Sequence, residues 1–248
     1  MAASPYTGKP VTDWLQVTHS LISQYPIHPQ EILDVAMLSW DRLWASQIGG
    51  QISLDEVELP ATVVGYFFQK LFAHELKVRY PNVWRGEELK SDKDLVNIQN
   101  PNFSTEMKSS GQLGYALFGN RSYNQLSESS TTSGKDKSGF YITVNFYRKA
   151  ITLLRIGWID QDDWIPQGAA TGQAAVLKPE VYQYKLLEIN GPYRYASPIE
   201  LLNGIGPKSV IQFHNEGVYT FGDLKNYSGF SPKILKTLQD NRPFLNSF

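Results

Sequence analysis

The chain has 248 residues, 42% of them hydrophobic and 19% charged, which is enough for one large domain and a small module. Its net charge of −1 argues against a protein that coats nucleic acid without specificity, because such proteins are usually basic. The sequence contains no cysteine, which excludes disulfides, thiolate metal sites and cysteine nucleophiles and fits a cytoplasmic protein.

The first third of the chain is expected to be helical. Apolar residues recur at helical spacing, and prolines or glycines mark the ends, over residues 12–25, 28–48 and 60–80. No apolar run reaches the roughly 18 residues of a membrane span, and the N-terminus lacks the basic start and apolar core of a secretory signal.

After Asp92 the pattern changes to short strands. Alternating and β-branched residues predict strands at 93–99, 103–110, 138–148 and 150–160. Residues 182–189 predict either a further strand or a short helix, and the polar stretch 126–139 predicts a loop. Helices followed by strands of this kind indicate an α/β (α+β) domain.

The segment "NFSTEMKSSG", residues 102–111, carries the most informative chemistry. Side chains alternate along a strand, so Glu106 and Lys108 share one face while Met107 lies on the other. A hairpin with the preceding strand would bring Asp94 to the same edge. Two carboxylates suit Mg²⁺, or Mn²⁺ in its place, and the metal lowers the pKa of its bound water. A lysine beside them can orient that water and balance charge, so we predict catalytic Asp94, Glu106 and Lys108, with both acids as metal ligands.

This arrangement resembles the PD-(D/E)xK nuclease superfamily, whose core hairpin carries an aspartate and then Glu-x-Lys on the next strand. Here Lys93 replaces the proline before Asp94, and Asn102 stands after Pro101 where a literal Pro-Asp would be sought. Asp94 is the preferred first acidic residue because the asparagine would be a weak ligand; Asn102 is the alternative. The segments "TEMKSSG", "FGNRSY" and "GWIDQDDW" resemble a ScaI-like restriction endonuclease family.

A carboxylate in the third expected helix is a further candidate. Glu75 lies on the apolar stripe of helix 60–80, where a charge is costly unless it is paired or bound to a metal. The superfamily often places a glutamate of the preceding helix near the metal, which implies a catalytic role for Glu75 or, less directly, for Gln69. The alternatives are a surface position or an ion pair between Glu75 and Arg79.

The last fifty residues read as short helices joined by glycine turns. The segment "LLNGIGPKSVIQF" resembles the helix-hairpin-helix motif of DNA repair and replication proteins, and "SGFSP" looks like a second, degenerate hairpin. Glycines allow a tight turn that exposes backbone N–H groups at a helix start, where phosphate binds well. The DNA-binding residues expected there are Gly204, Ile205, Gly206 and Lys208. Two further candidates for DNA contact, Arg121 and Asn124, lie in "FGNRSYNQ".

The resemblances imply a restriction-endonuclease-like domain at 1–192, with a mixed sheet flanked by helices, and a small all-α helix-hairpin-helix module at 198–248. The resemblances imply a Mg²⁺-dependent type II restriction endonuclease that acts on double-stranded DNA at a short specific site. They also imply a homodimer matched to a palindrome, and a cognate DNA methyltransferase for the same site. The alternatives are an XPF-like structure-specific repair nuclease, although Met107 departs from its Glu-Arg-Lys triplet, and a non-catalytic DNA-binding protein that retains the fold.

Overall fold

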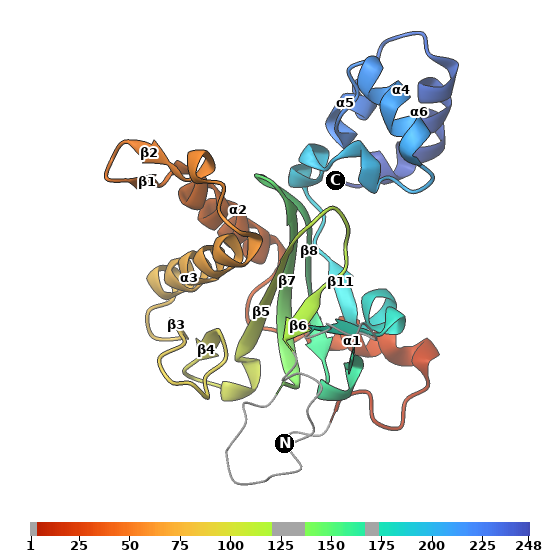
Figure 1. The fold of residues 1–248 in the computed structure, drawn as a ribbon. Helices are drawn as coiled ribbons and strands as arrows, with labels where there is room; N and C mark the ends of the chain where they lie inside the picture. The colour runs from red at the N-terminus through yellow and green to blue at the C-terminus, as the bar shows by residue number, and fades with distance from the viewer. Residues whose placement is uncertain (1–3, 121–136, 167–173) are drawn as a thin grey trace.

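A computed structural model describes residues 4–120, 137–166 and 174–248 (Figure 1). Its centre is a six-stranded sheet in the order β11-β8-β7-β5-β4-β3. β5 and β7 run parallel and the other neighbours antiparallel, so the predicted mixed sheet is confirmed. The strands are β3 (Trp84–Gly86), β4 (Leu95–Asn97), β5 (Thr105–Gly111), β7 (Gly139–Tyr147), β8 (Ala150–Ile159) and β11 (Leu186–Glu188).

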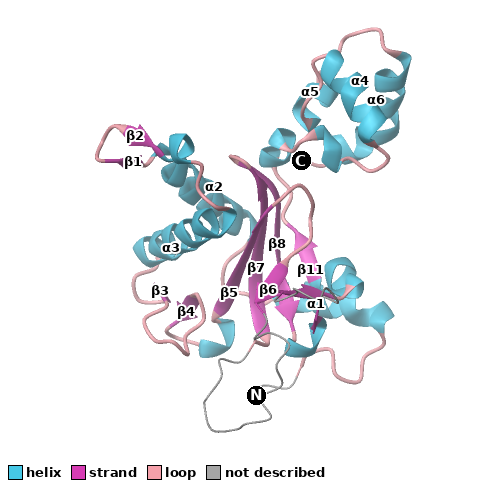
Figure 2. Cartoon of the chain, viewed as in Figure 1, coloured by secondary structure: helices cyan, strands magenta, loops and turns pink. Residues whose placement is uncertain are grey.

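Helices flank this sheet, as predicted. Figure 2 shows α2 and α3 together on one side of the sheet, and α1 lies near its opposite edge. In the part of the chain that is described, no helix is both long and apolar enough to cross a membrane. The N-terminal helices are α1 (Trp14–Ser23), α2 (Pro29–Ala45) and α3 (Ala61–Arg79), and the C-terminal ones are α4 (Pro207–Asn215), α5 (Phe221–Lys225) and α6 (Pro232–Leu245).

The main core lies between α2, α3 and one face of the sheet. Trp40 of α2 packs edge-on against Phe68 of α3, with ring centroids 5.6 Å apart, and its ring lies 5.2 Å from that of Phe146 in β7. Met107 belongs to this core, as the strand alternation predicted. Burying these large rings supplies a hydrophobic free energy that holds both helices on the sheet.

β7 is buried on both faces, including the face that carries its polar residues. Tyr141, Thr143 and Asn145 are each 0% exposed. A second layer covers them, built from the three-stranded sheet β6 (Phe118–Asn120), β10 (Ala174–Leu177) and β9 (Trp164–Pro166). The sequence did not reveal these strands because three or four residues are too few for a period-2 pattern. The same holds for the hairpin of β1 (Gln47–Ile48) and β2 (Ile52–Ser53).

A buried lysine, Lys185, contacts both the N-terminal residues and the aspartates that follow β8. Residues 182–189 contain both predicted forms, a π-helical turn (Val181–Lys185) followed by β11. Lys185 Nζ lies 2.9 Å from Asp160 Oδ2 and 2.8 Å from Asp163 Oδ2, and also faces the rings of Tyr6 and Trp14. Burial raises the pKa of the Asp163 carboxyl above its ordinary value, and the hydrogen bond from Lys185 opposes that shift. The two aspartates that follow β8, Asp160 and Asp163, are therefore both paired with Lys185 inside the protein.

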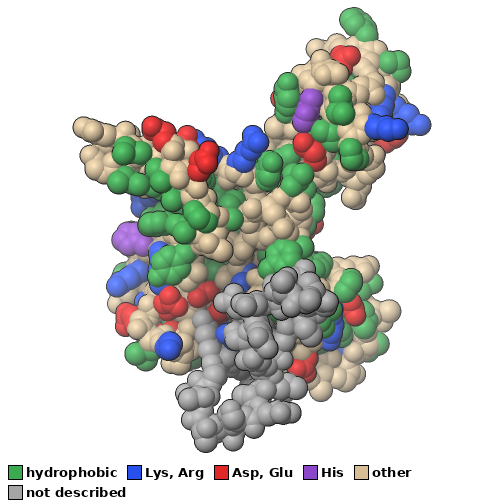
Figure 3. All heavy atoms as spheres, viewed as in Figure 1, with side chains coloured by type: hydrophobic (Ala, Val, Ile, Leu, Met, Phe, Trp, Pro, Cys, Tyr) green, Lys and Arg blue, Asp and Glu red, His purple; other side chains and the backbone are tan. Residues whose placement is uncertain are grey.

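The C-terminal residues form a unit with an apolar cluster of its own, made of Ile199, Leu202, Phe213, Val218, Phe221, Leu224, Ile234 and Leu245. Figure 1 shows this unit standing away from the sheet, and Figure 3 shows a hollow between it and the end of the molecule that carries β1 and β2. The prediction of an α-helix before the "GIG" turn is wrong, because the structure has only a 3-10 turn there, Ile199–Leu201. Too few residues separate Pro198 from Gly204 for a longer helix.

One arginine joins this unit to the rest of the protein. Arg194 is 2% exposed and precedes the unit in the 3-10 turn Pro192–Ala196. Its guanidinium lies 5.7 and 5.1 Å from the ring centroids of Phe244 and Phe248, and 5.6 Å from that of Tyr115. Its Nη1 also lies 3.2 Å from Glu188 Oε2. Arg194 thus contacts β11, the segment after β5 and the end of the C-terminal unit at once.

We predict that Lys185→Met lowers the free energy of unfolding by about 3 kcal/mol, because it leaves a carboxylate buried without its counter-ion. The matched control is Lys70→Met, which removes the partly exposed ion pair with Glu87 and should cost less than about 1 kcal/mol. Urea unfolding of both variants measures the difference. Equal, small losses would contradict a structural role for the buried cluster.

Candidate functional site

The three residues predicted from "NFSTEMKSSG" and its neighbouring strand come together in the structure. β4 pairs antiparallel with β5 through Leu95 and Thr105, and one further step of this register puts Asp94 opposite Glu106. Asp94 is 8% exposed and Glu106 5%. Lys108 is half-buried, two residues further along β5 and on the same face as Glu106.

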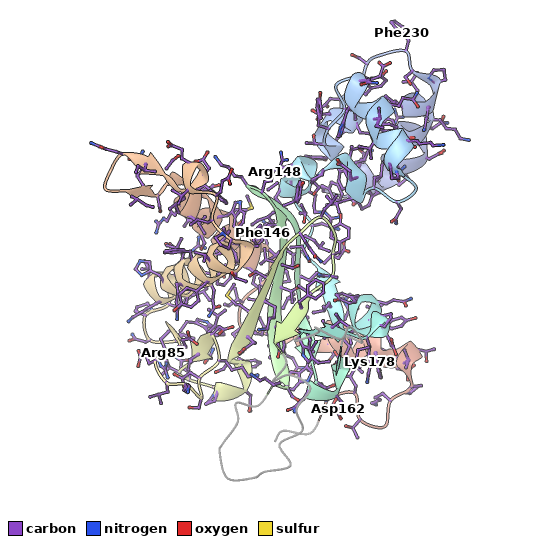
Figure 4. The ribbon with its side chains drawn as sticks, in the orientation of Figure 1. Arg85, Phe146, Arg148, Asp162, Lys178 and Phe230 are labelled. Carbon is purple, nitrogen blue, oxygen red and sulfur yellow. The ribbon has the colours of Figure 1, made fainter. Side chains whose placement is uncertain are left out.

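Hydrogen bonds hold Asp94 and the residues just before it in place. Its Oδ2 accepts from the backbone N–H of Met107 at 2.7 Å, which ties the carboxylate directly to β5. Just upstream, Arg85 of β3 donates to Asp92 at 2.7 Å, and this bond holds the pKa of the Asp92 carboxyl down at about 2 (Figure 4 labels Arg85). Lys93, which stands in the place of the superfamily's proline, donates to Ser138 O at 2.7 Å. The chain around Asp94 is therefore fixed to the strands on either side.

Asn102, the alternative to Asp94, lies elsewhere. It is exposed in the 3-10 turn Pro101–Phe103, and its backbone N–H donates to Asn100 Oδ1 at 3.1 Å. The asparagines thus form the turn between the two strands. The geometry places Asp94, and not Asn102, opposite Glu106.

Close packing of α3 on β5 brings Gln69 next to Lys108. A Cβ atom at Gly65 would lie 2.0 Å from Ser109 Oγ and 3.2 Å from Ser109 Cβ, so the glycine at this position favours a close approach of the helix to the strand. A small cavity beside this contact is lined by Gly65, Phe68, Gln69, Met107, Lys108, Ser109 and Val144. Gln69 therefore shares a cavity with a predicted site residue.

Glu75 has a different environment. It is 3% exposed, and its carboxylate forms an ion pair with Arg42 of α2. Arg79, the partner considered from the sequence, lies 3.6 Å from Glu31 instead. The arginine on the neighbouring helix explains how a carboxylate is tolerated in the apolar stripe of α3. The structure thus gives Glu75 a role in joining two helices.

A row of polar residues that the sequence analysis did not identify extends the site across the sheet. Lys108 pairs with Thr143 in β7, and Thr143 pairs with Arg155 in β8. Arg155 is 3% exposed and donates to Thr143 Oγ1 at 3.3 Å and to Asn145 Oδ1 at 2.6 Å. A lone arginine within the apolar strand "AITLLRIGWID" was the available signal, because a charge there must find partners inside the protein.

Arg155 also holds the segment that follows β5. Its Nη2 donates to Tyr115 O at 3.0 Å, and Asn145 Nδ2 donates to Ala116 O at 3.1 Å. Burial lowers the pKa of the Arg155 guanidinium to about 10, which leaves it protonated at neutral pH. The next backbone N–H, of Leu117, donates to the hydroxyl of Tyr182 at 2.9 Å. These bonds fix residues 115–117 over the face that carries Lys108.

The donor set at Asp94 and Glu106 fits a magnesium ion. Mg²⁺ is typically held by one or two carboxylates, with water and substrate phosphate as the other ligands. Asp94 and Glu106, on neighbouring strands, supply two carboxylates. Because both are buried side by side, their negative charges favour a cation between them. Within the described ranges, no group of three or more His, Cys, Asp or Glu residues could hold a metal ion.

The C-terminal candidates lie on one turn. Gly204 has φ of +84°, a conformation that favours glycine, and Gly206 is the N-cap of α4. Ile205 packs against the apolar cluster of the unit, while Lys208 is exposed in the first turn of α4. Arg121 and Asn124 lie outside the described residues.

Comparison with known proteins identifies a family for this chain. The family model for the ScaI restriction endonuclease matches residues 4–190. The type II restriction enzyme ScaI of Streptomyces caespitosus is 32% identical over 196 residues, which cover 75% of this chain and 85% of that enzyme. A solved restriction endonuclease in complex with substrate DNA aligns over 83% of this chain and 97% of its own, at 10% identity and a TM-score of 0.36, which is too weak to bear on the fold.

The matched region contains the whole six-stranded sheet with Asp94, Glu106 and Lys108, and ends before the C-terminal unit. The predicted ScaI-like resemblance is confirmed, and with it the expectation of a restriction endonuclease. This chain belongs to the ScaI restriction endonuclease family.

Proposed function

We propose that this chain is a type II restriction endonuclease that uses Mg²⁺ to hydrolyse phosphodiester bonds in double-stranded DNA at a short palindromic site. The observation that carries the proposal is the position of Asp94 opposite Glu106, with Lys108 on the same face, in a member of a restriction endonuclease family. Family membership supports the reaction class, and the paired carboxylates support the metal.

Asp94 and Glu106 are the proposed ligands of Mg²⁺, and Mn²⁺ has the same preference for oxygen donors. Bound there, the ion would lower the pKa of a water molecule and take up negative charge at the phosphate. The N–H of Met107 orients Asp94 by its 2.7 Å hydrogen bond. That bond keeps one carboxylate oxygen directed at β5 and fixes the position of the other.

Lys108 is the proposed cationic residue of the reaction. From the same face as Glu106, its ammonium group can orient the attacking water and stabilise charge on the phosphate. Gln69, on the shared cavity, is a candidate to position the lysine side chain or the water. Glu75 is a weaker candidate because Arg42 already neutralises it.

The rival functions have less support. A structure-specific repair nuclease of the XPF-like kind would carry arginine between the glutamate and lysine, whereas Met107 is 6% exposed and packs in the apolar core. A non-catalytic DNA-binding protein would have no need for two buried carboxylates beside a lysine. The family match favours cleavage over both.

We also propose a role for the C-terminal unit in holding DNA. The turn at Gly204–Gly206 leads into α4, whose first-turn N–H groups and Lys208 suit phosphate oxygens. Contacts of this kind would add affinity without reading sequence. A restriction enzyme of this type further implies a DNA methyltransferase that protects the same site and need not bind this chain.

Purified protein with Mg²⁺ should cut a plasmid into discrete fragments with defined ends. Discrete fragments are expected because the enzyme would cut only at its recognition sequence. Sequencing the fragment ends then identifies that sequence and the cut position. Omitting the metal, or adding a chelator, should stop cleavage. A smear of products, or cleavage confined to branched substrates, would contradict the restriction function.

Glu106→Gln and Asp94→Asn should each lower the cleavage rate by more than about 100-fold, because the metal loses a charged ligand. Lys108→Ala should lower it by about 10²–10³-fold through loss of charge stabilisation. Asn102→Ala is the matched control and should cut at the rate of the unchanged protein. Single-turnover cleavage and Mg²⁺ titration of each variant provide the measurement; full activity of Glu106→Gln would refute the site.

Two active sites related by two-fold symmetry match a palindrome and can cut both of its strands, so we propose a homodimer. Sedimentation at micromolar concentration should give about twice the chain mass of 28.1 kDa. A single-chain mass, both free and on DNA, would rule out this arrangement.

A further inference from the structure

The turn between α5 and α6 presents a phenylalanine almost entirely to solvent. Phe230 is 93% exposed, and among the large apolar side chains of the described residues none is more exposed. Figure 4 shows it at the far tip of the C-terminal unit, pointing away from the protein. A fully exposed aromatic ring forgoes roughly 2–3 kcal/mol of burial free energy, which insertion into a partner would recover.

The backbone that carries Phe230 is braced. The hydroxyl of Tyr227 accepts from the N–H of Ser231 at 3.1 Å and donates to Glu216 at 2.9 Å. A Cβ atom at Gly229 would lie 2.4 Å from that hydroxyl, so the turn packs directly on the tyrosine and needs glycine there. The backbone at Phe230 is therefore fixed by a defined turn, which lowers the backbone entropy lost when the ring inserts into a partner.

The surroundings of Phe230 favour anions. α4 and α6 each begin with a proline after a tight turn, and neither has an acidic residue in its first turn. Lys233, in the first turn of α6, donates to Ser209 in the first turn of α4 at 2.7 Å, so the two helix starts adjoin. With Lys208 and Lys233 both exposed, two positive helix starts stand beside the aromatic tip.

We propose that Phe230 is a wedge that inserts between neighbouring base pairs from the minor groove of DNA, while the starts of α4 and α6 hold the flanking phosphates. The inference rests on the proposed DNA-cleaving function. The minor groove is about 6 Å wide, so its two phosphate rows suit two adjoining helix starts, and apolar wedges are a known means of unstacking and bending DNA there.

Other partners fit this tip less well. A stable protein interface buries about 800 Å² on each side, and one ring between two lysines offers far less apolar area. A membrane-binding surface needs an extended apolar face along a helix. The combination of one ring and two anion-binding helix starts matches a duplex best.

The test uses the full-length protein without Mg²⁺, to prevent cleavage, and a mixed-sequence 30-base-pair duplex. Phe230→Ala should bind this duplex at least about fivefold more weakly, as expected for the loss of one base–aromatic stack. The matched control is Tyr219→Ala, which removes another exposed aromatic of the unit, on the groove that faces the β7–β8 turn. It should bind within about twofold of the unchanged protein.

A second variant reports insertion directly. In Phe230→Trp, addition of the duplex should quench the emission of the introduced indole and shield it from acrylamide, relative to the unchanged protein. Thermal unfolding should be the same for both Phe230 variants, since the side chain touches little of the protein. Unchanged affinity of Phe230→Ala together with an accessible indole would overturn the wedge.

Lys208→Ala separates the wedge from the wider DNA role of the unit. If this variant weakens binding and lowers the salt slope by about one while Phe230→Ala does not, the unit grips phosphates and the wedge is refuted. If neither variant matters although the protein cuts plasmid DNA, cleavage stands and the unit has no DNA role. If Phe230→Ala alters sedimentation or binding to anionic vesicles and not to DNA, the tip serves another partner and the inference fails.

Discussion

The parallel pairing of β5 with β7 is the constraint on which the rest of the molecule depends. Seven successive residues of β5, from Thr105 to Gly111, are matched with Phe140 to Phe146. This register sets Lys108 beside Thr143 and, through β8, in line with Arg155. It also requires the chain to return along the sheet before β7 begins, because parallel neighbours cannot be joined by a hairpin. The described start of that return, residues 115–117, is held on the sheet by Arg155 and Asn145.

Local patterns predicted the geometry of the candidate hairpin. Alternation along one strand placed Glu106 and Lys108 together, and the short turn after β4 placed Asp94 opposite them, so the information lay within about fifteen neighbouring residues. The helices and the longer strands followed from periodicity for the same reason, whereas the mixed sheet was implied by the family resemblance. The helix expected before Gly204 failed because the apolar residues there pack in a single 3-10 turn.

Partners that are distant in sequence could not be predicted in this way. The arginine that pairs with Glu75 comes from α2, and no spacing rule links Arg42 to it. Similarly, Arg155 serves Thr143, Asn145 and Tyr115 O, which meet only when three segments fold onto each other. The close contact of Gly65 with Ser109, which brings Gln69 to Lys108, also depends on how a helix settles on a strand. Such contacts are decided by packing and not by local preference.

The placement of Arg194 bears on how this enzyme could acquire or exchange its C-terminal unit. The family match ends at residue 190, and the apolar cluster of the unit is its own, so the unit has the character of an appended part. Its orientation is nevertheless set by aromatic rings that pack on Arg194 from both sides. Tyr115 belongs to the nuclease portion, and Phe244 and Phe248 belong to the unit. A transplant onto another family member would therefore have to carry the connector from Pro192 onward and find an aromatic residue at the position of Tyr115. Without an aromatic residue at that position, the C-terminal unit would be linked to the recipient enzyme but would have no fixed orientation relative to its nuclease portion.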